Sequence, residues 1–459
     1  MNMSCFVNST KDCRLLIPVT KDKYSEWKTK QNHQTKTWLL NSRFNAEPGD
    51  FCIVPDENSI PNKVLIGISQ EFNLWDFSDL PKKLPYGNYK IDHQNIENIE
   101  KWCLGWALGS YSFDKFKTTN PRKIARLVIK NRNKIEVAVR ATYLVRDLIN
   151  TPASHMNPEE LAKVAKKIAD QNKGKFKVIV GENLLKKNFP AIHAVGRAVK
   201  DKEQEPRLID IKWGKKNHPK VILVGKGVCF DTGGLNLKPT NGMKLMKKDM
   251  GGAANALGLA QMIMSTKLPI QLRVLIPAVE NNVSGNAIRP LDIIKSRNGK
   301  TIEITNTDAE GRVILADALA EACSDKPDLI IDFATLTGAA RVALGTEIPV
   351  LFTNDDKFAA ALTKSGLAEQ DPVWRLPLWH DYRNMVLGDS ADLNNAPDGG
   401  YAGAITAALF LNEFIEPNIK WAHIDHMAWN IVSKPGRPKG GEAMGLRSVY
   451  NVIRNTYTD

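Results

Sequence analysis

The chain has 459 residues, of which 43% are hydrophobic and 25% are charged, and its formal net charge is +13. These values predict a globular protein of two or three domains, and no apolar run approaches the ~20 residues that a membrane-spanning helix needs. The N-terminal segment lacks a basic stretch followed by an apolar one, so we expect no signal peptide, and the six scattered cysteines favour reduced thiols in a cytoplasmic protein over a disulfide framework or a zinc site.

Residues 1–120 contain short apolar runs separated by Pro, Asn and Gly, among them CRLLIPV, DFCIVP and KVLIGIS. This texture predicts strands joined by turns. From about Pro121 to Asn150 apolar residues recur at three- and four-residue spacing, which predicts a long helix. We therefore expect a small N-terminal α/β domain over 1–120 and a linking helix over 121–150.

Beyond Asn157, strands, glycine turns and helices alternate. The expected strands include KVILVG, IQLRVLIPAVEN, TIEIT and DLIIDFA, and the expected helices include GGAANALGLAQMIM, RVILADALAEA and GAITAALFLNEFI. This alternation, with continuously apolar strands, predicts a mostly parallel central sheet covered by helices. We expect residues 151–459 to form this larger C-terminal domain, with its ligands at the carboxyl ends of the strands.

Charged side chains gather at the strand-to-helix turns of this region. They are Lys226, Asp231, Lys238, Asp249, Asp308, Glu310 and Arg312. A single Asp at such a turn usually caps a helix or faces solvent. Four carboxylates at one edge of one sheet repel one another strongly unless cations neutralise them, and divalent ions suit oxygen ligands. The cluster therefore favours a hydrolase with two metal ions about 3.5–4 Å apart.

The sequence disfavours three other kinds of site: a nucleotide-binding loop, a histidine metal site and a catalytic thiol. The dinucleotide-binding pattern would need a glycine where Phe230 stands, and the phosphate-loop pattern is absent. His423 and His426 flank Asp425 in WAHIDH, but we expect buried, hydrogen-bonded histidines here and not metal ligands. The cysteines have no neighbouring histidine in the sequence, which disfavours a thiol nucleophile.

The same stretches resemble the leucyl (cytosol) aminopeptidase family, two-metal exopeptidases with a small N-terminal domain and a larger catalytic one. The family signature N-T-D-A-E-G-R-[LV] stands at 306–313, and VGKGVCFDTGG, MKKDMGGAA, DFATLTGA, AGAITAALFL and WAHID match further family segments. The resemblance covers the chain from about Asn150 and is only generic before it. It implies that 151–459 is a metallopeptidase domain.

The resemblance implies a metal-binding role for five positions. Asp231, Asp308 and Glu310 match the ligands of one divalent ion. Lys226, Asp231, Asp249 and Glu310 match those of the other, with zinc or manganese favoured and magnesium or cobalt also accepted. Lys226 must then bind as a neutral amine, which a neighbouring dication allows by lowering the pKa of the lysine.

Two further positions match residues of the family's chemistry. Lys238 matches a catalytic lysine that polarises the scissile carbonyl, and Arg312 matches an arginine that holds a bicarbonate-type anion as general base. The implied enzyme is a metal-dependent aminopeptidase that releases the N-terminal amino acid from peptides. Family members form homohexamers of two stacked trimers, so we expect a homohexamer that acts on peptide substrates.

The resemblance also implies a substrate pocket. Its substrate-binding positions are Lys238, Met246, Asp249, Thr335, Leu336 and Gly338. Met246, Thr335 and Gly338 are expected to line the pocket for the first side chain, and Leu336 to offer backbone contacts. An apolar pocket separates related side chains by only ~1–3 kcal/mol per methylene, so we expect a broad preference that leans towards Leu and Met, and poor cleavage after an acidic residue.

Two other functions stay open on the residues alone. A two-metal phosphatase also needs a carboxylate cluster, although Lys226 as a ligand and the LTGA loop favour the peptidase. The net charge of +13 also fits a nucleic-acid-binding protein, but the lysines are dispersed and no nucleic-acid-binding motif occurs. A nucleic-acid role is compatible with the peptidase role.

Overall fold

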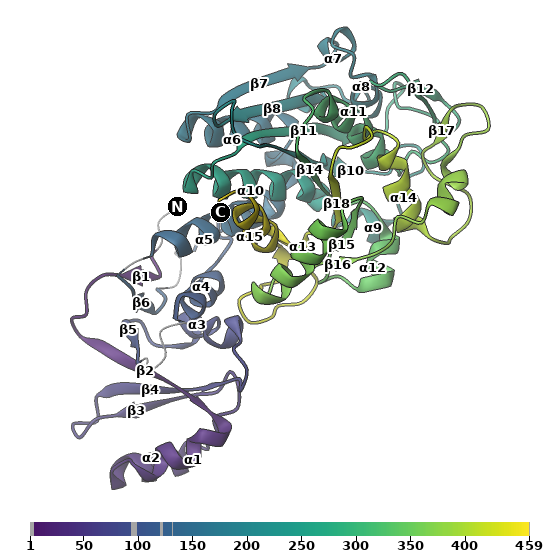
Figure 1. Ribbon diagram of the computed structural model, residues 1–459. Helices are drawn as coiled ribbons and strands as arrows, with labels where there is room; N and C mark the ends of the chain where they lie inside the picture. Colours follow the sequence, from purple (N-terminus) through teal and green to yellow (C-terminus); the bar gives the residue numbers. More distant parts are fainter. Residues whose placement is uncertain (1–3, 93–98, 120–122, 131, 459) are drawn as a thin grey trace. The chain divides into compact units, whose positions relative to one another are not determined.

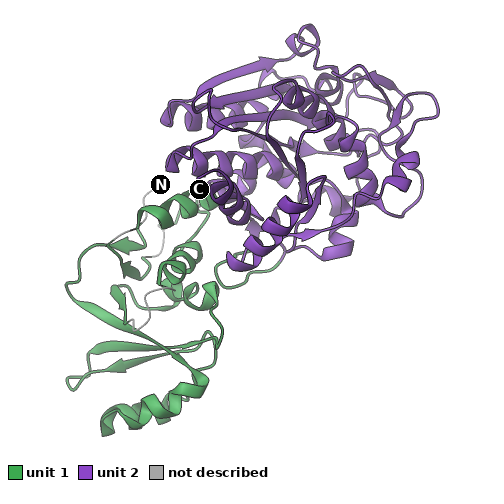
Figure 2. Ribbon diagram, in the orientation of Figure 1, with its two compact units in different colours: residues 1–143, 432–439 green, residues 144–431, 440–459 purple. Residues whose placement is uncertain are grey.

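The computed structural model describes residues 4–92, 99–119, 123–130 and 132–458 (Figure 1). The chain forms two compact units, one of residues 1–143 and 432–439, the other of residues 144–431 and 440–459 (Figure 2). The sequence did not predict that residues 432–439 belong to the first unit. The expected domain boundaries at 120 and 150 stay a prediction.

The first unit contains a six-stranded sheet in which each pair of neighbours is parallel except β4 and β3. In spatial order the strands are β1 (Phe6–Val7), β6 (Arg126–Val128), β5 (Asn88–Ile91), β2 (Cys13–Thr20), β4 (Pro61–Ile68) and β3 (Phe51–Pro55). Its helical elements are α1 (Lys21–Thr29), α2 (His33–Asn41), the 3-10 turn η1 (Leu74–Phe77), α3 (Leu80–Lys83) and α4 (Ile99–Gly109). Helix α4 is buried along most of its length and packs on η1.

The helix expected over 121–150 is shorter in the structure. Helix α5 spans Asn133–Asn150, whereas Arg126–Val128 form strand β6 between β1 and β5. Leu127 is fully buried and its two neighbours are half-buried, which is the alternation of a strand. The helix prediction is therefore wrong for these residues, because strand pairing outweighed the local apolar spacing. Residues 121, 122 and 131 lie outside the described residues.

The second unit contains a nine-stranded, mostly parallel sheet, as predicted. Eight strands run in the order β16 (Trp374–Arg375), β15 (Val350–Thr353), β18 (Trp421–Asp425), β14 (Leu329–Ala334), β9 (Lys220–Gly225), β11 (Gln271–Asn281), β8 (Arg207–Trp213) and β7 (Lys175–Val180), and β10 (Gly227–Asp231) pairs with β11. The antiparallel pairs are β7–β8, β8–β11 and β15–β18. Strand β9 is apolar and fully buried from Val221 to Val224, as a strand covered on both faces must be.

Helices cover both faces of this sheet (Figure 1). One layer contains α6 (Pro158–Gln171), α10 (Gly251–Thr266), α13 (Asp356–Ala368) and α15 (Leu446–Tyr457), and the other contains α8 (Pro190–Gly196), α11 (Glu310–Ser324), α12 (Gly338–Leu344) and α14 (Gly403–Asn412). Shorter elements are η2 (Ala153–His155), α7 (Asn183–Lys186), η3 (Lys202–Gln204), α9 (Thr240–Met243), η4 (Met246–Lys248), η5 (His380–Val386), β19 (Trp429–Asn430) and β20 (Gly440–Gly441). Within the described part of the chain, no helix is long and apolar enough to cross a membrane.

The strand before NTDAEGRV does not belong to the central sheet. Strand β13 (Thr301–Glu303) pairs with β12 (Ile293–Lys295) and β17 (Leu393–Asn394) in a separate three-stranded sheet. The expectation that this stretch continues a central strand is therefore wrong. Helix α11 carries the stretch to the central sheet instead, because α11 packs on β9 and β11.

A buried ion pair joins α5 to the segment before α15. Arg146 Nε lies 2.9 Å from Glu442 Oε1 and Arg146 Nη2 lies 2.9 Å from Glu442 Oε2, with side chains 1% and 6% exposed. Glu442 also accepts a hydrogen bond from Asn430 Nδ2 at 2.7 Å. Both charges are therefore satisfied out of contact with solvent.

We expect Glu442→Leu to lower the free energy of unfolding by about 3–5 kcal/mol, because it leaves the Arg146 cation buried without a counter-charge. Urea denaturation measures this loss. The double variant Arg146→Met/Glu442→Leu removes both charges and should recover most of it. An equal loss in the single and double variants would contradict the ion-pair account.

Candidate active site

The charged stretches of the sequence meet where several elements of the second unit begin or end. Lys226 lies between β9 and β10, and Asp231 is the last residue of β10. Asp249 lies between η4 and α10, Asp308 lies in the loop before α11, and Glu310 begins α11. A strand end thus holds Asp231 and a helix start holds Glu310, while the other three side chains lie in the connections beside such ends.

These residues line a cavity of about 390 Å³. The positions singled out in the sequence that line it are Lys226, Asp231, Lys238, Met246, Asp249, Asp308, Glu310, Arg312, Thr335, Leu336 and Gly338. The structure therefore brings every predicted site residue to one cavity, while the role of each stays a prediction.

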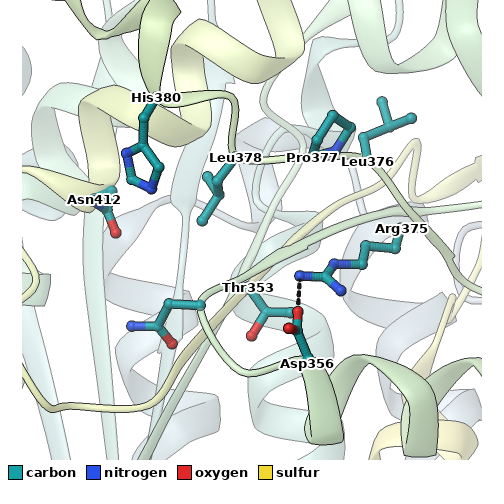
Figure 3. A pocket seen from close by; sticks show the side chains of 9 residues that line it. Thr353, Asp356, Arg375, Leu376, Pro377, Leu378, His380 and Asn412 are labelled. Carbon is teal, nitrogen blue, oxygen red and sulfur yellow. Dashed lines mark hydrogen bonds and ion pairs between the residues drawn. The ribbon is translucent and has the colours of Figure 1, made fainter.

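A larger cavity of about 570 Å³ lies beside β15 and β16 (Figure 3). None of the predicted positions lines it. Asp356 is the one carboxylate among its lining residues, and its Oδ1 is paired with Arg375 Nη2 at 2.5 Å. This cavity therefore offers no cluster of ligands for a metal ion.

Lys226 binds two of the carboxylates. Its Nζ lies 2.8 Å from Asp249 Oδ2 and 2.9 Å from Glu310 Oε1, and it donates to the Thr335 carbonyl at 2.9 Å. Burial disfavours the charged amine, but the two carboxylates outweigh burial and raise the pKa of Lys226. A Cβ at Gly311 would lie 2.5 Å from Lys226 Cε, so the lysine can reach the carboxylates only past a glycine.

Lys238 binds the other two carboxylates. Its Nζ lies 2.8 Å from Asp231 Oδ2 and 2.5 Å from Asp308 Oδ1. Asp231 Oδ1 also accepts from the Gly233 N–H at 2.9 Å and from Asn281 Nδ2 at 2.8 Å. Burial opposes the charge on Lys238, but Asp231 and other carboxylates outweigh it and raise the pKa of this lysine too.

The cluster holds more negative charge than these two lysines balance. Asp231, Asp308 and Glu310 each offer an oxygen, and these oxygens lie within 4.8 Å of one another. Burial, followed by the charge of Asp231, raises the pKa of Glu310 to about 8, so the side chain retains a proton at neutral pH. For Asp249, Lys226 and Lys248 outweigh the effect of burial and lower the pKa to about 2. A buried set of carboxylate oxygens and one amine fits divalent metal ions.

Arg312 fits a small anion. Its Nη1 donates to the Asn395 carbonyl at 2.7 Å, and its Nε is buried without a hydrogen-bond partner among the described residues. Burial lowers the pKa of the guanidinium to about 10, so Arg312 remains a cation at neutral pH. A buried guanidinium N–H with no acceptor suits a carboxylate- or carbonate-like oxygen.

The WAHIDH segment supports the site without joining it. Asp425 accepts from the backbone N–H groups of Leu336 and Thr337 at 2.9 and 3.0 Å and so fixes the loop after β14. His423 Nδ1 lies 2.6 Å from an oxygen of Asp332. Neither ring nitrogen of His426 has a hydrogen-bond partner within the part of the chain that the structure describes. The expectation of buried, hydrogen-bonded histidines is therefore right for His423 and wrong for His426.

The sequence reasoning missed three residues of the site. Lys248 is buried at 2% exposure, and its Nζ lies 4.0 Å from Asp249 Oδ1; its place beside Asp249 in MKKDMGG was an available signal. Arg341 lines the cavity from α12, and a single arginine in a helix gives no signal. Asn395 holds Arg312 from a segment 83 positions away, which no local pattern reveals.

Burial lowers the pKa of Lys248 to about 8. The carboxylate of Asp249 opposes this effect, and the positive charge of Arg341 adds to it. Lys248 and Arg341 therefore act on each other as like charges on the wall of one cavity.

Both units of the chain are similar to known proteins. The cytosol aminopeptidase family, catalytic domain, matches residues 143–450, and the N-terminal domain of these aminopeptidases matches residues 15–130. The crystal structure of the cytosol aminopeptidase from Coxiella burnetii has a TM-score of 0.95 and 48% identity, and the match covers 99% of both chains. The bottromycin maturation enzyme BotP in complex with Mn has a TM-score of 0.86 and 28% identity, over 96% of this chain and 99% of that one.

A curated relative, Peptidase B of Enterobacter sp. (strain 638), is 41% identical over 381 residues, which are 79% of this chain and 88% of the relative. The resemblance found in the sequence from about Asn150 is thus confirmed, and the N-terminal domain match extends it to residues 15–130. The chain belongs to the cytosol aminopeptidase family, and it is a hydrolase of the metallo-exopeptidase type.

Proposed function

We propose that the protein uses two divalent metal ions to release the N-terminal amino acid from peptides, with a broad preference that includes Leu and Met. The observation that carries this proposal is the convergence of four carboxylates and two lysines in one buried cavity. Such a cluster is unfavourable unless cations compensate it. Membership of the family disfavours the phosphatase alternative.

The family resemblance assigns the ligands to the two ions. Asp231, Asp308 and Glu310 would hold one ion, and Lys226, Asp231, Asp249 and Glu310 the other. Manganese or zinc is favoured, with magnesium or cobalt also accepted, and the similar enzyme BotP is described in complex with Mn. When bound, the two ions polarise the scissile carbonyl and lower the pKa of a bound water.

Lys238 and Arg312 supply what the ions do not. The Lys238 ammonium lies against two of the proposed ligands, Asp231 and Asp308, so it can donate a hydrogen bond to the carbonyl oxygen as negative charge develops there. Arg312 would bind a bicarbonate-type anion through its free Nε, and this anion would accept the proton of the attacking water.

The first side chain of the substrate would lie against Met246, Thr335 and Gly338, which all line the cavity. Thr335 Oγ1 donates to Asp249 Oδ1 at 2.7 Å and so links this pocket to the proposed metal site. The Leu336 N–H is already bonded to Asp425, so the backbone contact that Leu336 offers a peptide would be its carbonyl.

The family resemblance also supports a homohexamer, and the relatives' name, cytosol aminopeptidase, supports a cytoplasmic location. The net charge of +13 leaves a nucleic-acid role open, although no motif supports one.

We expect the metal-loaded enzyme to cleave leucine p-nitroanilide and to leave N-acetyl-leucine p-nitroanilide intact, because an acetylated amine can no longer bind a metal ion. Release of p-nitroaniline measures both reactions, and p-nitrophenyl phosphate serves as the control for phosphatase activity. Efficient cleavage of the acetylated substrate would rule out the exopeptidase mechanism.

We expect Lys238→Ala to lower kcat on the order of 100-fold or more, because an electrophilic donor is lost, while the metal content stays near normal. Glu310→Gln should lose bound metal as well as activity. Plasma mass spectrometry gives the metal content. The matched control is Lys364→Ala, which changes an exposed lysine of α13. Full activity in Lys238→Ala would exclude its proposed role.

We expect the affinity for the metal ions to rise with pH between about pH 6.5 and 8.5. Without metal, Lys226 carries a proton because its pKa is raised, and Glu310 carries one below its pKa of about 8. Both protons must leave before these side chains bind an ion, so a higher pH favours binding. Competition with a chelator gives the affinity, and titration calorimetry in two buffers counts the released protons. Affinity independent of pH would show that neither group is a ligand.

A further inference from the structure

Two cations on the cavity wall have no part in the proposed chemistry. Arg341 extends from α12 and lines the cavity, and its guanidinium has no hydrogen bond or ion pair with any other described residue. Lys248 is 2% exposed, and its one ion-pair contact, with Asp249 Oδ1, is long at 4.0 Å. Buried or half-buried charges of this kind are unfavourable unless a partner compensates them.

Both cations lie beside the residues proposed to receive the first side chain. A Cβ at Gly338 would lie 3.7 Å from Arg341 Nη2, so the guanidinium stands next to Gly338. Lys248 shares the single 3-10 turn η4 with Met246. The pocket between Met246 and Gly338 is therefore bordered by positive charge from two separate elements.

The cavity offers these cations no spare carboxylate. The acidic residues among those that line it are Asp231, Asp249, Asp308 and Glu310. Lys226 and Lys238 contact all four at 2.9 Å or less, and in the proposed function the same four bind the metal ions. The described residues that line the cavity thus leave Arg341 without a carboxylate, and the side chain of a bound substrate can supply one.

We propose that Arg341, assisted by Lys248, recognises the side-chain carboxylate of an N-terminal Glu or Asp. This inference rests on the proposed function and refines its substrate class. It replaces the expectation that an acidic first residue is a poor substrate, because that expectation assumed an apolar pocket. A charge-assisted hydrogen bond from a guanidinium to a carboxylate is among the stronger polar contacts in proteins.

The test compares p-nitroanilides of Glu, Gln and Leu with the manganese-loaded enzyme. These substrates have no C-terminal carboxylate, so a carboxylate effect must come from the first side chain, and Gln is the neutral match for Glu. We expect kcat/KM for Glu to exceed that for Gln at least about 10-fold. Arg341→Gln should lower the Glu/Leu ratio of kcat/KM roughly 10- to 100-fold, and Arg341→Lys should keep part of the preference.

Lys364→Gln removes one positive charge from α13 at a residue that does not line the cavity, and it should leave the ratio unchanged. The inference would be overturned if the Glu substrate were cleaved no better than the Gln substrate, or if Arg341→Gln left the Glu/Leu ratio of kcat/KM unchanged. Cleavage of the Leu substrate would still support the aminopeptidase function in either case. No cleavage of any of the three would instead defeat the proposed function. The enzyme could instead prefer Leu-Gly over Leu-Gly amide and lose this preference in Arg341→Gln, with no change in cleavage of the Glu substrate. That result would show that Arg341 recognises the C-terminal carboxylate of the peptide, and it would also overturn the inference.

Discussion

The mutual repulsion of four neighbouring carboxylates, three of them buried, is the constraint on which the second unit depends. Asp231, Asp249 and Glu310 are each at most 3% exposed, and like charges at such short range are strongly unfavourable in a poorly solvated cavity. Lys226 and Lys238 bridge the carboxylates in pairs. Burial, followed by the charge of Asp231, raises the pKa of Glu310, so that protonation of this side chain relieves part of the repulsion. The second unit therefore holds four carboxylates close together, and lysines and a proton on Glu310 offset their repulsion.

The scaffold makes this possible by close packing around the cluster. Gly252, in the first turn of α10, allows that helix to approach β14, because a Cβ there would lie 2.0 Å from the Phe333 carbonyl oxygen. The start of α10 is thus pressed against the strand ends, next to Asp249. Asp425 and Asn395 then fix the surrounding loops through backbone hydrogen bonds. The position of Asp249 follows from this packing, whereas Asp308 depends on the loop before α11.

The sequence predicted the parts of the site whose signals are local. NTDAEGRV and the glycine-rich loop after β9 carry their charged residues at fixed spacing, and the apolar strands predicted the mostly parallel sheet. The failures are long-range. Strand β13 pairs outside the central sheet, Arg126–Val128 pair with strands far away in sequence, and residues 432–439 join the first unit. The ring nitrogens of His426 have no hydrogen-bond partner among the described residues, because tertiary packing sets the surroundings of the ring and its neighbours in WAHIDH do not predict them.

The chemistry and the substrate preference are therefore encoded differently. The four carboxylates and two bound dications would cancel, since four negative charges meet four positive ones. Lys238, Lys248, Arg312 and Arg341 would then remain as positive charges around the cavity. In the proposed function, Arg312 would hold the anionic base and Lys238 would face the carbonyl. The remaining pair acts on whatever enters the pocket for the first side chain. The positive charges of this pair attract a carboxylate on the first side chain of the substrate, whereas a leucine side chain gains nothing from them. Under this proposal, two residues outside the signature octapeptide, Lys248 and Arg341, would set the preference for the first side chain.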